Sequence, residues 1–146
     1  MTTLKMKKMR PDAVIPRRAT PGSAGLDLCA CIDAPLLLPA RGGHAVIPTG
    51  IAVGLPEGTA GFVFARSGLG VKHGVALSNG VGVIDSDYTG EICVGLLNQF
   101  DEPYEIQPGE RIAQLVVMPA VCPPVEEAEA LTRTQRGAGG FGSTGR

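Results

Sequence analysis

Short runs of apolar residues, separated by turn residues, recur along the whole chain. Combinations such as Pro21-Gly22 and Pro108-Gly109 stand between the runs, and such residues favour tight turns. Many short strands at this spacing are typical of an antiparallel sandwich or jelly roll. The apolar runs occupy residues 26–32, 36–38, 45–47, 51–55, 62–64, 81–84, 92–97 and 111–118. We therefore expect an all-β fold, a jelly-roll or β-clip-like sandwich.

Two stretches have some helical character. Residues 67–73 can form one or two helical turns between apolar runs. In residues 125–131, Glu and Ala favour a helix by propensity, but Pro123-Pro124 before them and a glycine-rich stretch after them favour an extended arm. Both alternatives stay open for the second stretch, and we expect at most one short helix.

The C-terminal stretch 136–146 reads RGAGGFGSTGR, in which five of eleven residues are glycine and Phe141 is the one large side chain. Ordering such a segment costs conformational entropy that it cannot recover by packing on itself. Its G-x-G-x-x-G spacing is not a dinucleotide fingerprint, because too few residues follow for a helix and a βαβ unit. We expect a jelly-roll core at residues 1–123 and an extended segment at 124–146, whose last part, 136–146, is a flexible arm.

Composition narrows the class of protein. The chain has 146 residues, enough for one domain with a real core, and is 44% hydrophobic without a long apolar span. We expect it to be soluble, intracellular and cytoplasmic, with no membrane partner. Charged residues make up 18%, below the usual quarter, which suggests that other copies of the chain cover part of the surface. The net charge of −1 gives no sign of a surface that binds nucleic acid.

Basic residues are concentrated near the start of the chain and fit a solvated edge strand. They are Lys5, Lys7, Lys8, Arg10, Arg17 and Arg18.

Cysteine and histidine usage argues against two common kinds of site. Without an export signal the four cysteines should stay reduced. Cys29 and Cys31 lack a second pair or a nearby histidine that would complete a zinc site. His44 and His73 do not lie beside a nucleophile in a recognisable motif, so Ser-His-Asp catalysis has little support.

Polar clusters of a kind used in phosphate chemistry interrupt the strands. Arg66 and Ser67 stand where a strand ends and a short helix begins, and such a position suits an anion. Asp85 follows the apolar pair Val83-Ile84, which places a carboxylate at the end of a buried strand, where desolvation can tune its pKa for base catalysis.

Two further polar residues stand within apolar strands. Asp27 lies between Leu26 and Leu28, on the outward face of its strand, where plain solvent exposure is the simplest interpretation. Gln114 lies in an otherwise apolar run, and a buried amide needs hydrogen-bond partners.

Taken together and in order, five segments resemble the five motifs of the trimeric deoxyuridine triphosphate nucleotidohydrolases, the dUTPases. The segments are AGLDL, ARSGLG, NGVGVIDSDYTGEI, PGERIAQLVV and RGAGGFGSTG. The likeness runs from about Arg18 to Gly145. It implies a jelly-roll homotrimer with three sites at subunit interfaces, each covered by the C-terminal arm of another chain.

The resemblance also implies a reaction, the hydrolysis of dUTP to dUMP and pyrophosphate. This reaction limits uracil in DNA and supplies dUMP for thymidylate synthesis. Asp85 would orient and deprotonate the water that attacks the α-phosphorus, and Gln114 would add a contact near that phosphate. Mg²⁺ would be chelated mainly by the three phosphates, with Asp27 holding it through a water.

The remaining site residues carry over by the same resemblance. Phe141 would stack on uracil, and Tyr88 would lie against the sugar and reject UTP. Main-chain groups of a hairpin between Asn79 and Cys93 would read the base. The full substrate-binding set is Arg66, Ser67, Gly68, Asn79, Val83, Ile84, Asp85, Tyr88, Cys93, Arg136, Phe141, Gly142, Ser143 and Thr144.

Two other functions remain open at this stage. A nucleotide-sensing interaction module could keep the fold and use arm closure to control a partner. The related dCTP deaminases share the jelly roll but act on the cytosine ring. An intact Asp85, Gln114 and arm favour the hydrolase.

Overall fold

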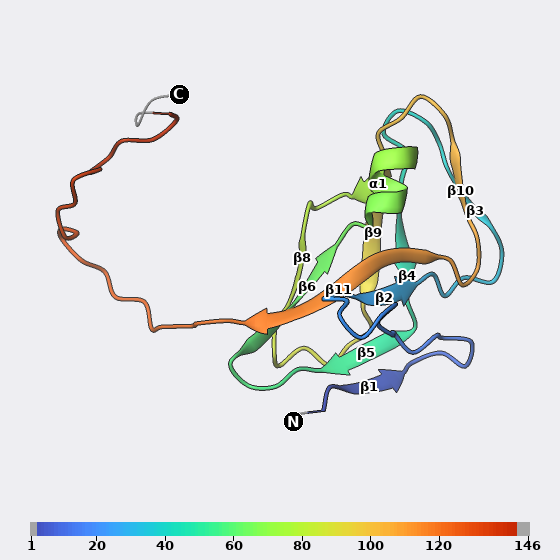
Figure 1. Ribbon diagram of the computed structural model, residues 1–146, viewed down its shortest axis with the longest axis horizontal. Helices are drawn as coiled ribbons and strands as arrows, with labels where there is room; N and C mark the ends of the chain where they lie inside the picture. The colour runs from blue at the N-terminus through green and yellow to red at the C-terminus, as the bar shows by residue number, and fades with distance from the viewer. Residues whose placement is uncertain (1–2, 143–146) are drawn as a thin grey trace.

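The computed structural model describes residues 3–142 and folds them into antiparallel sheets with one short helix (Figure 1). The strands are β1 (Lys5–Lys8), β2 (Leu26–Cys29), β3 (Leu36–Leu38), β4 (His44–Pro48), β5 (Ile51–Gly54), β6 (Thr59–Phe64), β7 (Val75–Leu77), β8 (Gly82–Ile84), β9 (Cys93–Asn98), β10 (Tyr104–Ile106) and β11 (Arg111–Pro119), and the helix is α1 (Ser67–His73). The expected all-β fold with one short helix is confirmed.

Two larger sheets contribute to one hydrophobic core. The first has the strand order β2-β11-β6-β8, and the second has the order β4-β9-β7. Two ribbons, β1-β5 and β3-β10, complete the set. Fully buried side chains from both sheets, among them Leu28, Leu96 and Leu115, belong to the same core cluster. The sheets are therefore the two layers of a sandwich.

Strand alternation explains which side chains enter the core. Along β9, Val94, Leu96 and Asn98 are buried, and the residues between them are less so, as the two-residue period of a strand requires. Asn98 is polar, and its amide donates to the carbonyl oxygens of Leu38 and Glu102. The buried amide is thus satisfied, and it ties β9 to the end of β3 and to the loop before β10.

The segment between β8 and β9 is not the expected hairpin. β8 pairs with β6 in the first sheet, whereas β9 pairs with β4 and β7 in the second. Residues 85–92, which we call the crossover segment, therefore pass from one sheet to the other. The hairpin prediction was wrong because Asp and Gly residues indicate a turn without indicating which strands it joins.

Helix α1 begins directly after β6 and ends at Gly74. Leu69 is buried and fixes the helix to the core. Gly74 has a φ of 67°, in the left-handed region, and an added Cβ would lie 2.2 Å from the ring of Phe100. Glycine is required there on both counts. No helix within residues 3–142 has the length and apolar character needed to cross a membrane.

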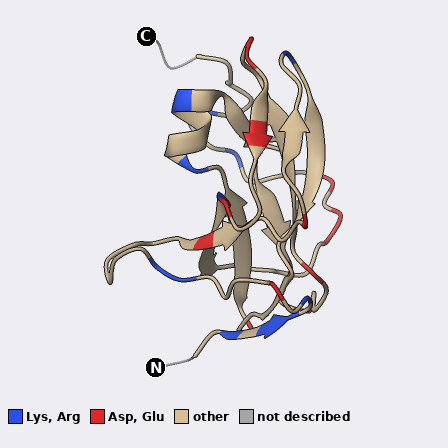
Figure 2. Cartoon of the chain, turned by 90° about the vertical axis from the view of Figure 1, so that its right-hand side faces the viewer, with Lys and Arg blue, Asp and Glu red and all other residues tan. Residues whose placement is uncertain are grey.

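β1 is one of the two strands of its ribbon, and Figure 2 shows it largely in the blue of Lys and Arg. Met6 packs against the core, whereas Lys5, Lys7 and Lys8 face solvent. In the single chain this agrees with the interpretation of the basic N-terminal stretch as a solvated edge strand.

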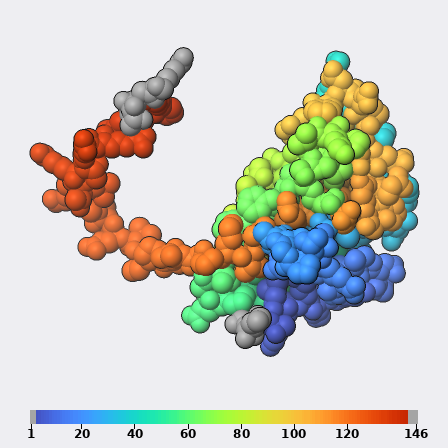
Figure 3. Space-filling model, viewed as in Figure 1, coloured from blue at the N-terminus to red at the C-terminus, as the bar shows by residue number. Residues whose placement is uncertain are grey.

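The C-terminal segment leaves the sandwich after β11 and runs away from it (Figures 1 and 3). The Ala120 N–H donates to the Gly58 carbonyl, and the described side chains beyond this point are exposed. Val125 is 100% and Leu131 88% exposed. Residues 125–131 contain no helix, so the extended arm is the alternative that holds.

Candidate active site

Polar side chains gather in two pockets at opposite edges of the four-stranded sheet. The arginine pocket, beside β2 and β11, has a volume of about 340 Å³ and is lined by Asp27, Arg66, Ser67, Gly68 and Gln114 together with Ala19, Ser23, Ala24 and Gly25. The crossover pocket, beside β8, has a volume of about 340 Å³ and includes Asn79, Val83, Ile84, Asp85, Tyr88 and Cys93 in its lining.

These two pockets share no lining residue. β2 and β8 are the outer strands of the sheet, so three inter-strand spacings, roughly 14 Å, separate the two edges. The structure therefore divides the predicted site residues into two sets instead of joining them in one pocket of one chain.

Strand register builds the arginine pocket. Asp27 of β2 pairs directly with Gln114 of β11, and Gln114 also pairs with Phe64 at the end of β6. The chain then turns into α1 through Arg66. Residues from three separate segments of the chain thus meet at one end of adjacent strands, and three of the quoted motifs are brought together.

Asp27 is held by two arginines. Its Oδ1 lies 3.0 Å from Arg66 Nε, and its Oδ2 lies 3.2 Å from Arg111 Nη1. Arg66 Nη1 also donates to the Arg111 carbonyl at 3.1 Å. The Asp27 side chain is 20% exposed, so the interpretation of plain solvent exposure was wrong. Two guanidinium groups around one carboxylate leave this cluster with a net positive charge, which suits a polyanion.

Gln114 finds its partner at the end of β6. Its Nε2 donates to the Ala65 carbonyl at 3.0 Å, in a partly buried setting. An added Cβ at Gly25 would lie 2.4 Å from Gln114 Oε1. The glycine of the AGLDL segment therefore gives the Gln114 amide its place beside the pocket.

Asp85 lies in the crossover pocket, but its own chain does not bury it. Val83 is 63% exposed, Ile84 is buried, and the chain leaves the sheet at Asp85, which is exposed. The expectation that a buried strand end desolvates this carboxylate was wrong for the single chain.

Tyr88 lies over Gly90 at the far side of this pocket. Its hydroxyl donates to the Glu91 carbonyl at 2.9 Å, and an added Cβ on Gly90 would lie 2.6 Å from the Tyr88 hydroxyl oxygen. The side chain is 46% exposed. The ring therefore offers a face to a ligand instead of filling the core.

Cys93 and Asn79 complete the crossover pocket. Both residues are exposed. The protein around the Cys93 thiol desolvates it in part, and this effect and the nearby Glu91 carboxylate raise its pKa, so the thiol stays neutral near pH 7. This agrees with a contribution from its main chain and gives no support to a nucleophilic role.

The arm residues lie away from both pockets. Phe141 is fully exposed, with a φ of 50°. Arg136 Nε donates to the Gly139 carbonyl at 2.9 Å, which closes a local turn, and Gly142 has a φ of 86°. Ser143 and Thr144 lie outside the described residues.

The motif reading did not single out three charged residues near the pockets. Arg111 binds Asp27 across 84 positions, and Arg10 binds Glu91 across 81. Arg111 and Glu91 lie within the quoted motifs, and that position was the one sequence feature that could have identified them as site residues. Nothing in the local sequence pattern pointed to Arg10.

The donor set limits what metal this chain can hold. Within residues 3–142 no three His, Cys, Asp or Glu side chains come together as a metal site. Both Asp27 oxygens already accept from guanidinium groups. Asp27 therefore fits a metal held through a water, whereas direct coordination would require it to release an arginine.

Comparisons of the sequence and of the fold with known proteins all point to one family. The dUTPase family model matches residues 11–145. The chain is 50% identical over 150 residues to the deoxyuridine 5′-triphosphate nucleotidohydrolase of Desulfitobacterium hafniense, covering 99% of each chain. It is 52% identical over 133 residues to that of Thiobacillus denitrificans, covering 90% of each.

Solved structures agree with this. The dUTPase of Staphylococcus bacteriophage 80alpha with dUPNHPP has a TM-score of 0.90 and 29% identity, and the match covers 100% of both chains. A mutant dUTPase of S. aureus phage phi11, described as revealing the coordination of a structural Mg(II) ion, has a TM-score of 0.76 and 25% identity over 88% of this chain and 98% of that one. With the fold, the two polar pockets and the ordered motifs, these matches show that the chain belongs to the dUTPase family.

Proposed function

We propose that the chain hydrolyses dUTP to dUMP and pyrophosphate with Asp85 as the general base. One observation carries this assignment. Of the two carboxylates that line the pockets and stood out in the sequence, Asp27 is engaged by two arginines, whereas Asp85 makes no ion pair within residues 3–142. A base needs a free oxygen to take a proton from water. Asp85 has one, and the Asp27 oxygens are occupied.

The arginine pocket is proposed to hold the triphosphate. Arg66 and Ser67 offer charge and a hydroxyl, Gly68 gives room for close approach of the backbone, and Gln114 is fixed beside them. Displacement at phosphorus needs little covalent help from the protein, so positioning and charge neutralisation lower most of the barrier.

Mg²⁺ is the proposed cofactor. When bound to the triphosphate, it would neutralise charge and help to orient the phosphates. Asp27 would hold it through a water, because both carboxylate oxygens of Asp27 are already paired with arginines. The phage phi11 relative, described with a structural Mg(II) ion, supports the presence of this metal in the family.

The crossover pocket is proposed to hold deoxyuridine. Main-chain groups of Val83, Ile84 and Cys93, with Asn79, would read the uracil edge, and Tyr88 would lie against the deoxyribose. A cytosine would leave buried donors or acceptors unpaired, which discriminates strongly. Phe141 would stack on the base once the arm closes.

We further infer a homotrimer in which copies share each site. A nucleotide that occupies both kinds of pocket would be bound by the arginine pocket of one copy and the crossover pocket of another. The arm, which leaves its own sandwich, would cover a site built by other copies. Closed rotational symmetry repeats such a shared site once per copy. The four free cysteines support a reducing compartment such as the cytoplasm as the place of action.

The assignment of Asp85 can be tested by measuring pyrophosphate release from dUTP with Mg²⁺. Asp85→Asn keeps the size of the side chain but removes the base, so turnover should fall about a hundredfold or more while dUTP still binds. Asp87→Asn, on the same exposed segment, is the matched control and should stay close to wild type. Turnover by Asp85→Asn at the wild-type rate would remove Asp85 from the role of base.

A further inference from the structure

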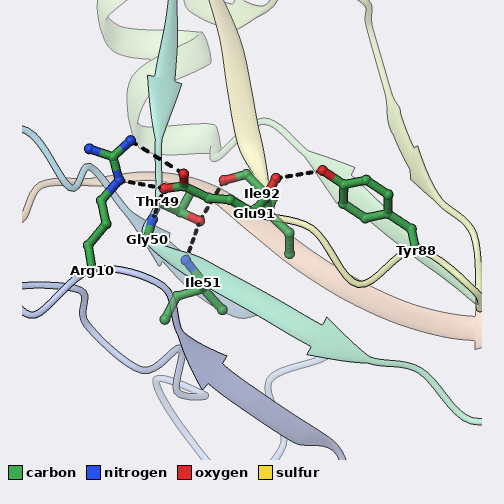
Figure 4. Close-up of polar contacts among 7 residues, drawn as sticks. All are labelled: Arg10, Thr49, Gly50, Ile51, Tyr88, Glu91 and Ile92. Carbon is green, nitrogen blue, oxygen red and sulfur yellow. Dashed lines mark hydrogen bonds and ion pairs between the residues drawn. The ribbon is translucent and has the colours of Figure 1, made fainter.

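Glu91 lines the crossover pocket, but its carboxylate is tied to another part of the chain (Figure 4). Arg10 Nε lies 2.9 Å from Oε1, and Arg10 Nη2 lies 3.3 Å from Oε2. The Gly50 N–H also donates to Oε1, at 2.7 Å. The carboxylate thus accepts a forked guanidinium and a main-chain donor together, which fixes it more strongly than a single ion pair.

The main chain of the same residue holds Tyr88. The Glu91 carbonyl accepts from the Tyr88 hydroxyl at 2.9 Å (Figure 4). Within residues 3–142, this bond is the side-chain hydrogen bond that fastens the tip of the crossover segment, residues 85–90. The position of the Tyr88 ring therefore depends on where Glu91 is held.

The next residue is anchored separately. The Ile92 N–H donates to the Ile51 carbonyl at 2.8 Å, and the Ile92 carbonyl accepts from the Thr49 hydroxyl at 2.7 Å. Thr49 is buried. The end of the crossover segment is thus fixed by the core, and loss of Arg10 would loosen Glu91 without detaching Ile92 and β9.

We propose that Arg10 is a positioning residue for the nucleoside pocket: through Glu91 it sets where the Tyr88 ring lies. This inference rests on the proposed place of Tyr88 against the deoxyribose. Arg10 lies outside the five recognised motifs and makes its contact from the loop after β1. Its role is to keep the ring close enough to exclude a 2′-hydroxyl, and so to help select dUTP over UTP.

The test compares kcat/KM for dUTP with kcat/KM for UTP in wild type and variants. The ratio of the two values does not depend on the fraction of folded protein, because misfolding lowers both values equally. Arg10→Ala should raise KM for dUTP and lower the ratio roughly three- to tenfold, with kcat for dUTP changing less. Arg10→Lys should restore the ratio in part, because an ammonium keeps the charge but lacks the fork.

Arg41 offers a matched control. Its Nε lies 2.8 Å from Asp101 Oδ1, with both side chains largely exposed and neither in the lining of the crossover pocket. Arg41→Ala removes the same kind of ion pair and should leave the ratio unchanged.

Tyr88 variants separate failure of the inference from failure of the proposed function. Tyr88→Phe removes the bond to the Glu91 carbonyl, so it should lower the ratio to about the same extent as Arg10→Ala, with little further loss in the double variant. A lowered ratio in Tyr88→Phe with a wild-type ratio in Arg10→Ala would overturn the role of Arg10 alone. A wild-type ratio in Tyr88→Ala would overturn the proposed place of Tyr88, and the inference with it.

Discussion

At the scale of single residues, the site contrasts two aspartates. Asp27 is part of a strand pair and is enclosed by Arg66 and Arg111, so its charge is satisfied by its own chain. Asp85 stands where β8 ends and is exposed. The first arrangement suits a fixed electrostatic element, and the second suits a group whose surroundings change when substrate binds.

Tyr104, outside both pockets, makes the free energy of unfolding depend on pH. Burial, together with the hydrogen bond to Glu110, raises the pKa of Tyr104 to about 12 from its usual 10.0. The folded state therefore binds this proton more tightly than the unfolded state. This contribution to stability is fully present below pH 10 and is lost as the pH rises towards 12.

Replacement of Tyr104 by Phe should remove that part of the pH dependence. We expect the free energy of unfolding to fall less between pH 10 and pH 12 in Tyr104→Phe than in wild type, as measured by urea unfolding at each pH. Other groups that titrate in this range act equally in both proteins. Identical slopes for the two proteins would mean that Tyr104 has no such role.

Residue identity at the pockets could be predicted from sequence, but the pairing of residues could not. Local motifs selected Asp27, Gln114 and Asp85, because a polar residue within an apolar strand or directly after one suggests a hydrogen-bond partner or a functional role. The bond between Arg111 and Asp27 depends on how β2 and β11 align, 84 positions apart. Arg10 reaches Glu91 through a loop whose course depends on tertiary packing. Neither contact leaves a local signal.

At the scale of elements, the fold follows from periodicity, and its exceptions follow from packing. The helix at Ser67–His73 forms because Leu69 has a core to bury against. Residues 125–131 have good helical composition but no such surface, since Val125 and Leu131 are exposed, and packing supplies most helix stability in proteins. The order of strands in the two sheets could not be predicted from the sequence. Turn residues indicate where the chain bends, but they do not indicate which strands pair.

The C-terminal arm gives a prediction at this scale. Truncation after Gln135 removes residues that make no described contact with their own sandwich, so the thermal unfolding midpoint should stay close to that of wild type. Hydrolysis of dUTP should fall about tenfold or more, because the arm would no longer be there to close as a lid over the uracil and the phosphates, as we propose. Both quantities can be measured on the same preparation.

A truncated chain with full activity would show that the arm is not part of the site. A large drop in the unfolding midpoint would instead mean that the arm stabilises the assembly. The Phe141→Ala variant of the full chain refines the result, since it keeps the arm and removes the proposed stacking surface.

At the scale of the whole molecule, one chain has two separate polar pockets, which we propose are the two halves of a shared site. The arginine pocket and the crossover pocket lie at opposite edges of one sheet, and the arm runs away from the sandwich (Figure 3). Large apolar side chains such as Val46, at 68%, and Leu37, at 57%, are exposed on the single chain. The low charge content anticipated such a surface, and in the proposed homotrimer the association of copies would cover it and complete each site.

Complementation between two inactive variants tests this shared site most directly. Arg66→Ala damages the arginine pocket, and Asp85→Asn damages the crossover pocket. The two variants, unfolded together in equal amounts and refolded, should recover about one quarter of wild-type dUTP hydrolysis, because about one site in four then combines two intact halves from different copies. Activity no higher than the sum of the separately refolded variants would contradict the account, since it would mean that each chain builds its site from its own residues.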